Sequence, residues 1–179
     1  LVFAEALGAA AFIAKLRVQY LRNVGPALSP FNSFLIAQGL ETLSLRVERH
    51  LENAHKVATW LEARADVSSV NWASLDSSKY KALADKYVPR GSGAVLTFEL
   101  PGGVDAGRAF IDALELHSHV ANIGDVRSLA IHPASTTHSQ MTAEEQLAAG
   151  VTPGLVRLAV GLEGIDDILA DLETGFAAI

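Results

Sequence analysis

Residues 122–140, NIGDVRSLAIHPASTTHSQ, gather side chains that could do chemistry: two His, three Ser, two Thr, an Arg and an Asp around one apolar run. His132 and His138 lie six residues apart, whereas a helical zinc pair is spaced by four, and no third ligand stands at a suitable spacing. Ser135 lacks the flanking glycines of a nucleophile elbow. The spacing therefore disfavours a metal site and a Ser–His hydrolase, and leaves the wall of a ligand pocket or a polar loop.

A second candidate is Arg157, in the run GLVRLAVGLE. If this run is a strand, its aliphatic residues share one face, and Arg157 shares the other face with Ala159 and Gly161. A half-buried guanidinium needs a partner, and its planar fork suits a carboxylate. Spacing alone favours a structural ion pair with Glu163 or Asp125 and leaves a ligand carboxylate as the alternative.

The elements that must position these residues follow from hydrophobic periodicity. Strands are predicted where β-branched or alternating runs are bounded by Gly and Pro, at residues 67–73, 93–100, 128–133 and 155–163. Helices are predicted where apolar residues recur at three- and four-residue spacing, at residues 3–23, 29–64, 77–87, 103–117, 142–150 and from 164 onward. The pattern predicts an α/β (α+β layered) fold with two leading helices and a small sheet.

The second of these helices should begin with Ser29 as its N-cap and Pro30 at its first position. At ~1.5 Å per residue it would be roughly 50 Å long, more than one small core needs. We therefore predict two regions: residues 1–63, a helical region that packs on a larger domain, and residues 64–179, a C-terminal α/β domain. Because the only Met is Met141, we expect the chain to be a piece of something longer.

Composition excludes several classes of function. The formal charge is −6, Lys and Arg are scattered singly, and 7% of residues are aromatic. The chain therefore has neither a basic surface to bind a phosphate backbone nor enough aromatic side chains to stack on bases, which disfavours nucleic-acid binding. The apolar opening segment is interrupted by Glu5 and Lys15 and lacks the basic start of a signal peptide. The absence of Cys excludes disulfides and thiolate chemistry and fits a reducing, cytoplasmic location. No nucleic-acid or membrane partner is predicted.

Three long segments carry a family resemblance: residues 29–62, 122–150 and 153–172. They resemble the C-terminal half of the Cys/Met metabolism family of pyridoxal-phosphate enzymes, and most closely its O-acetylhomoserine sulfhydrylase branch. The resemblance implies the small C-terminal domain of a fold-type I transferase. Such a domain has a small, mostly antiparallel sheet with helices on one face, preceded by two linking helices.

The resemblance also implies substrate-binding residues. Arg157 is similar to the family's arginine that grips the substrate α-carboxylate, which reverses the preference for a structural ion pair. Asn122 stands where much of the family has a Ser that contacts the same carboxylate. Thr137 lies in a loop that the family places beside the carboxylate end. Ala159 replaces a Ser common in the family, and that side chain is not part of the grip.

The cofactor of this family is pyridoxal phosphate, held by a Lys after a Ser/Thr-rich run and by a Gly-containing phosphate loop, both upstream. None of the five lysines of this chain has such a context: Lys15, Lys56, Lys79, Lys81, Lys86. We therefore expect no catalytic or cofactor-binding residue in this chain, and no metal ligand either. The whole enzyme should be a homo-oligomer, a tetramer, that makes homocysteine from O-acetylhomoserine and sulfide, while the isolated chain should be inactive. The alternatives are a cystathionine or methionine γ-lyase or a γ-synthase of the family, or a catalytically silent α/β binding or oligomerisation module.

Overall fold

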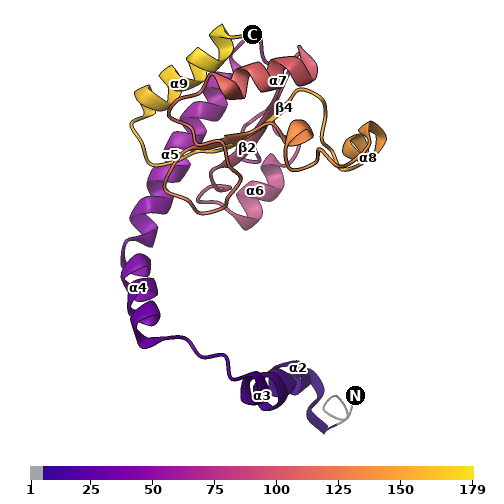
Figure 1. Ribbon diagram of the computed structural model, residues 1–179. Helices are drawn as coiled ribbons and strands as arrows, with labels where there is room; N and C mark the ends of the chain where they lie inside the picture. Colours follow the sequence, from indigo (N-terminus) through magenta and orange to yellow (C-terminus); the bar gives the residue numbers. More distant parts are fainter. Residues whose placement is uncertain (1–5) are drawn as a thin grey trace. The chain divides into compact units, whose positions relative to one another are not determined.

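The computed structural model describes residues 6–179, which divide between Leu43 and Ser44 into two compact units (Figure 1). The first unit is helical, and residues 1–5, which include the start of the helix predicted over residues 3–23, lie outside the described part. Its described part includes four short helical segments: η1 (3₁₀) Gly8–Ala10, α2 Ala11–Lys15, η2 (π-helical) Leu16–Leu21, α3 Arg22–Val24. They are followed by Gly25, which has a left-handed backbone conformation (φ 69°). The predicted helix end near Gly25 is confirmed, because Gly adopts this conformation without steric cost.

The predicted helix over residues 29–64 is two helices, α4 (Pro30–Glu41) and α5 (Leu43–Glu62). Its start is confirmed, since the Ser29 hydroxyl accepts a hydrogen bond from the backbone N–H of Asn32 at 3.2 Å. The prediction of one continuous helix is wrong. Thr42 has φ −106° and ψ 8°, outside the helical region, and a β-branched residue three positions after Gly39 weakens helix formation there.

The second unit is built on a four-stranded sheet of order β1-β2-β4-β3, in which every neighbouring pair is antiparallel. Each strand lies inside a predicted range: β1 Ser69–Asn71, β2 Val95–Glu99, β3 Leu129–Ile131, β4 Leu155–Ala159. The remaining elements are α6, α7, η3, α8 and α9: Lys81–Tyr87, Gly103–Asp112, Pro133–Ser135, Ala143–Ala148, Ile165–Ala177. The predicted antiparallel sheet is confirmed.

One face of the sheet carries the core. Leu96 and Phe98 of β2 lie beside Leu158 and Val156 of β4, and all four side chains are buried. Helices α7 and α9 pack on this face, as predicted, and α5 packs there too (Figure 1). Since side chains alternate along a strand, Arg157 points to the opposite face.

Helix α5 joins this core only through its C-terminal half, where the buried residues are Asn53, Ala54, Val57, Ala58 and Leu61. Its predicted apolar stripe begins earlier, but Leu43 and Val47 remain exposed. The predicted boundary between residues 63 and 64 stays a prediction. The packing of this exposed half on a larger domain stays a prediction as well.

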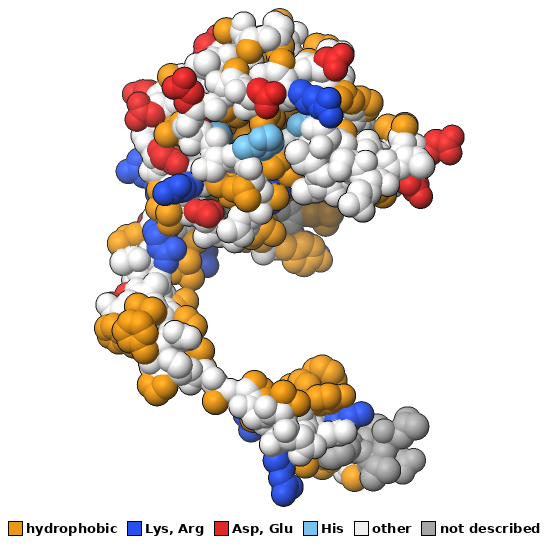
Figure 2. All heavy atoms as spheres, viewed as in Figure 1, with side chains coloured by type: hydrophobic (Ala, Val, Ile, Leu, Met, Phe, Trp, Pro, Cys, Tyr) orange, Lys and Arg blue, Asp and Glu red, His pale blue; other side chains and the backbone are white. Residues whose placement is uncertain are grey.

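The helices before the sheet also expose hydrophobic side chains, visible in Figure 2 as orange spheres along α4. Five of them are more than half exposed: Phe31, Phe34, Leu35, Ile36, Leu40. Contiguous exposed apolar surface of this kind usually marks an interface.

We therefore expect the isolated 179-residue chain to self-associate. Sedimentation velocity over a concentration series should show dimers or larger species, because association removes this apolar surface from water. Phe34→Ser together with Leu40→Ser should shift the profile toward monomer. A purely monomeric profile of the unsubstituted chain at every concentration would contradict the expectation.

Candidate functional site

Arg157 lies in the middle of β4, opposite Thr97 on β2 and Ile131 on β3. Its side chain is half-buried, and its Nη2 donates a hydrogen bond to the backbone carbonyl of Asn122 at 3.1 Å. No other hydrogen bond from this guanidinium, and no ion pair, occurs within residues 6–179. Because a guanidinium has five N–H donors in a fork, most of its binding capacity is left for another group.

The two carboxylates considered as partners of Arg157 are engaged elsewhere. Asp125 accepts the backbone N–H of Arg127 at 3.1 Å and meets the Asn122 amide nitrogen at 3.4 Å. Glu163 binds the backbone N–H and the hydroxyl of Ser128 at 2.7 and 2.8 Å. The ion pair that spacing alone favoured for Arg157 is therefore wrong. Both carboxylates are held by hydrogen-bond donors of the loop that precedes β3.

Asn122 meets Arg157 through its backbone, and its side chain folds back on its own loop. The side-chain oxygen accepts the backbone N–H of Ile123 at 2.8 Å. A turn at Gly124, which has φ 82°, follows at once. The structure thus brings Asn122 and Arg157 together through the backbone carbonyl of Asn122, a contact that the residue types alone do not predict.

Thr137 is exposed, and its hydroxyl pairs with the Nδ1 of its neighbour His138 at 2.9 Å. In the described part of the chain it shares no hydrogen bond with Arg157 or Asn122. Two of the three predicted substrate-binding residues therefore meet directly, and the substrate-binding role of all three stays a prediction.

His132 is buried between β3 and the loop before β4. Its Nε2 lies 2.8 Å from the carbonyl of Pro153, which can only accept, so the proton sits on Nε2. Its Nδ1 then accepts from the Ser135 hydroxyl at 2.8 Å. The ring leaves no room for a side chain at Gly107, where a methyl group would lie 2.6 Å from Nε2. These contacts make His132 a packing residue, and residues 6–179 contain no cluster of three potential metal ligands.

A hollow of about 270 Å³ opens on the same face as Arg157, two residues further along β4. Ala159 and Val95, paired across the two strands, line it together with Ile123 and Gly124 from the Asn122 loop and with residues of α5. The arrangement offers a cationic fork beside a mostly apolar hollow. Such a site suits a small molecule that carries a carboxylate.

Four of the lysines do not suit covalent attachment of a cofactor aldehyde, which needs an unprotonated amine. Lys56 pairs with Glu52 at 2.6 Å. The two oxygens of Asp85, each 2.7 Å away, raise the pKa of Lys81, which keeps that amine charged. Lys79 and Lys86 lie over neighbouring tyrosine rings. These four lysines therefore do not fit a Schiff-base site, whereas Arg157 fits a carboxylate site.

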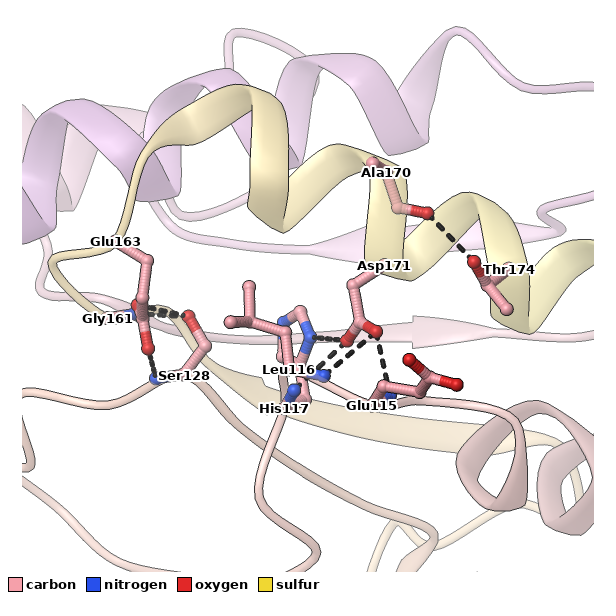
Figure 3. Close-up of polar contacts among 9 residues, drawn as sticks. All are labelled: Glu115, Leu116, His117, Ser128, Gly161, Glu163, Ala170, Asp171 and Thr174. Carbon is pink, nitrogen blue, oxygen red and sulfur yellow. Dashed lines mark hydrogen bonds and ion pairs between the residues drawn. The ribbon is translucent and has the colours of Figure 1, made fainter.

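The buried carboxylate of Asp171, on α9, binds residues 115–117 (Figure 3). It accepts the backbone N–H groups of Glu115, Leu116 and His117 at 2.7 to 3.0 Å, and it lies 2.6 Å from the His117 Nδ1. The predicted helix over residues 103–117 therefore ends at Asp112, because these N–H groups bind Asp171. Burial opposes ionisation of Asp171, but these hydrogen bonds outweigh it and lower its pKa.

Burial also lowers the pKa of His117 from its usual 6.5, against the opposing influence of Asp171 and Glu163. The neutral ring donates from Nδ1 to Asp171, and its buried Nε2 has no hydrogen-bond partner among residues 6–179. Unfolding returns this histidine to its ordinary pKa, so below that value the unfolded chain binds more protons than the folded one. The free energy of unfolding should therefore fall as the pH drops below about 6.5.

We expect His117→Gln to flatten this dependence, since Gln does not titrate. Urea unfolding between about pH 7 and pH 5 should give a smaller slope of unfolding free energy against pH for His117→Gln than for the unsubstituted chain. His119→Gln, at an exposed neighbouring position, should keep the original slope. Equal slopes for the chain and His117→Gln would show that this buried pair does not set the acid stability.

Comparisons with known proteins bear on this site. The family described as Cys/Met metabolism PLP-dependent enzyme matches residues 6–177. An O-acetyl-L-homoserine sulfhydrylase from Leptospira meyeri is 60% identical over 91% of the chain, and one from Corynebacterium glutamicum is 57% identical over 97%. The chain spans 37% and 40% of the lengths of these relatives.

A solved structure shows the same likeness. A Campylobacter jejuni protein assigned as an O-acetylhomoserine (thiol)-lyase superposes with a TM-score of 0.85 at 40% identity. The match covers 96% of this chain and 41% of that one, and that crystal contains N′-pyridoxyl-lysine-5′-monophosphate.

Proposed function

We propose that this chain, which belongs to the Cys/Met metabolism family of PLP-dependent enzymes, is the C-terminal part of an O-acetylhomoserine sulfhydrylase and supplies its grip on the substrate α-carboxylate. The observation that carries the proposal is the half-buried Arg157, held by the Asn122 carbonyl and paired with no carboxylate within the described chain. The sulfhydrylase relatives support the choice of reaction.

In this proposal each residue has a limited role. Arg157 binds the substrate carboxylate through two parallel N–H donors, and the Asn122 carbonyl fixes the orientation of the fork. Thr137 lies toward the same end of the substrate. Pyridoxal phosphate, which supplies the electron sink for the chemistry, would be held by residues outside this chain. The contribution of this chain is orientation, which lowers the entropic cost of reaching the reactive geometry.

The proposed reaction of the intact enzyme is replacement of the acetate of O-acetylhomoserine by sulfide, which yields homocysteine. The test supplies the intact enzyme with O-acetylhomoserine and sulfide in one assay and with cystathionine in another. The proposal expects homocysteine and acetate in the first assay and little turnover in the second. Efficient cleavage of cystathionine with no reaction of O-acetylhomoserine would instead support a γ-lyase.

We further propose that the enzyme is a cytoplasmic homo-oligomer, a tetramer. The cysteine-free composition supports the location, and the exposed apolar side chains of α4 support assembly. Within residues 6–179, no helix combines the length and the hydropathy required to cross a bilayer. Light scattering of the intact enzyme tests the assembly, which a monomeric mass would contradict.

The isolated chain should not form a Schiff base with pyridoxal phosphate. Lys56 and Lys81 pair with carboxylates and Lys79 and Lys86 are exposed, so borohydride reduction after incubation should give only scattered, substoichiometric adducts. Peptide mapping by mass spectrometry measures the adducts. One stoichiometric adduct at a single lysine would overturn this expectation.

A further inference from the structure

The segment that carries Asn122 is a loop with a closed neck. The backbone N–H of Ser118 donates to the carbonyl of Ser128 at 2.9 Å, and the N–H of Ala130 donates to the carbonyl of Ser118 at 3.1 Å. The two ends of the loop formed by residues 119–127 therefore lie next to each other beside β3. The position of the Asn122 carbonyl relative to Arg157 depends on how this neck is held.

One side of the neck is held by Asp171, which binds residues 115–117 immediately before Ser118. The other side is held by Glu163, whose two oxygens bind the N–H and hydroxyl of the fully buried Ser128 (Figure 3). The two carboxylates thus approach the ends of the loop from two segments, α9 and the turn after β4.

Glu163 is itself fixed to the sheet. The Ser128 hydroxyl oxygen accepts the N–H of Gly161 at 2.9 Å. The side-chain nitrogen of the buried Asn53, on α5, donates to the carbonyls of Gly161 and Glu163, each at 3.0 Å. A methyl group at Gly161 would meet the backbone of Arg127 and Ser128, so the close approach requires glycine. The turn after β4 and the loop neck therefore form one packed unit.

We propose that Glu163 is a positioning residue for Arg157, with Asp171 holding the other end of the same loop. This rests on the carboxylate-binding role proposed above for Arg157. Arg157 and Glu163 lie six residues apart in one run, and both act on the 119–127 loop: Arg157 binds its Asn122 carbonyl, and Glu163 binds its end at Ser128. Without the charged acceptor, the neck loosens and the guanidinium loses a fixed anchor.

The test is Glu163→Gln in the intact holoenzyme. Gln keeps the shape and one acceptor oxygen but loses the charge, so we expect KM for O-acetylhomoserine to rise on the order of tenfold, with kcat at saturation and cofactor absorbance retained. Hydrogen exchange should become faster at residues 119–127 and stay unchanged in the sheet. Ser128→Ala removes the hydroxyl link and should give the same pattern. Asp166→Asn, an exposed carboxylate on α9, is the matched control and should leave KM unchanged.

Two results would overturn the inference. One is a wild-type KM and wild-type loop exchange in both Glu163→Gln and Ser128→Ala. The other is a parallel loss of kcat, cofactor and protection throughout the domain, which indicates a structural role only. Arg157→Lys, assayed alongside, separates the two proposals. Full activity of Arg157→Lys would contradict the proposed function. Low activity of Arg157→Lys together with wild-type behaviour of Glu163→Gln would contradict only this inference.

Discussion

Replacing Arg157 by Lys should lower the kcat/KM of the intact enzyme on the order of a hundredfold or more, while pyridoxal phosphate remains bound. Lys keeps the positive charge but loses the planar fork that binds a carboxylate through two parallel hydrogen bonds. It also loses the donor that reaches the Asn122 carbonyl. Steady-state kinetics with O-acetylhomoserine and sulfide measures the loss, and the visible absorbance of the bound cofactor checks occupancy.

Arg108→Lys provides the matched control for this substitution. Arg108 is exposed on α7 and takes no part in the proposed site. Its replacement should leave kcat/KM at the unsubstituted value. If Arg157→Lys retained full efficiency as well, the assignment of Arg157 to the substrate carboxylate would be wrong.

Phe110→Ala should destabilise the sheet domain by about 3–5 kcal/mol. The Phe110 ring is fully buried on α7, with its centroid 5.4 Å from that of Phe98 and 5.0 Å from that of Phe176. Gly175 leaves the space that this ring occupies, since a methyl group there would lie 2.7 Å from it. Truncation would therefore open a cavity at the centre of the core, between the sheet and α9.

Urea unfolding at neutral pH measures that loss. Tyr87→Ala, which truncates an exposed aromatic side chain on α6, should change the unfolding free energy by less than about 1 kcal/mol. A comparably small change for Phe110→Ala would mean that the three packed phenylalanines do not form the centre of this core.

The parts of the fold that follow from local pattern could be predicted. The four strands lie within the ranges that alternation and bounding glycines predicted. The Ser29 cap forms because its hydroxyl accepts the backbone N–H of Asn32, three residues later in the chain. The last helix was predicted from apolar residues at helical spacing, and three of them, Ile168, Leu172 and Phe176, are buried on one face of it. These features depend on neighbours within a few residues along the chain.

Partner choice could not be predicted, because it depends on how loops approach one another. Spacing suggested that Glu163 or Asp125 would pair with Arg157, but both bind the loop between His117 and β3. The break at Thr42 likewise reflects a balance of weak preferences within a long helical pattern. The family resemblance corrected the first of these errors, whereas residue spacing could not.

Asp171 was missed, although the sequence contained a signal for it. It lies three residues after Ile168 and four before Gly175, on the stripe of α9 that is otherwise apolar. A carboxylate on such a stripe must find donors when the helix packs, because an unpaired buried charge is costly. Its donors, the N–H groups of residues 115–117, come from a segment that the periodicity assigned to a helix.

The central claim is that Arg157 binds the substrate carboxylate. A crystal structure of the intact holoenzyme with an unreactive amino-acid substrate analogue tests it most directly. The account predicts two parallel hydrogen bonds from the Arg157 guanidinium to the analogue's α-carboxylate, with the bond to the Asn122 carbonyl retained. An α-carboxylate bound by other residues, with Arg157 turned away or paired with a protein carboxylate, would contradict it.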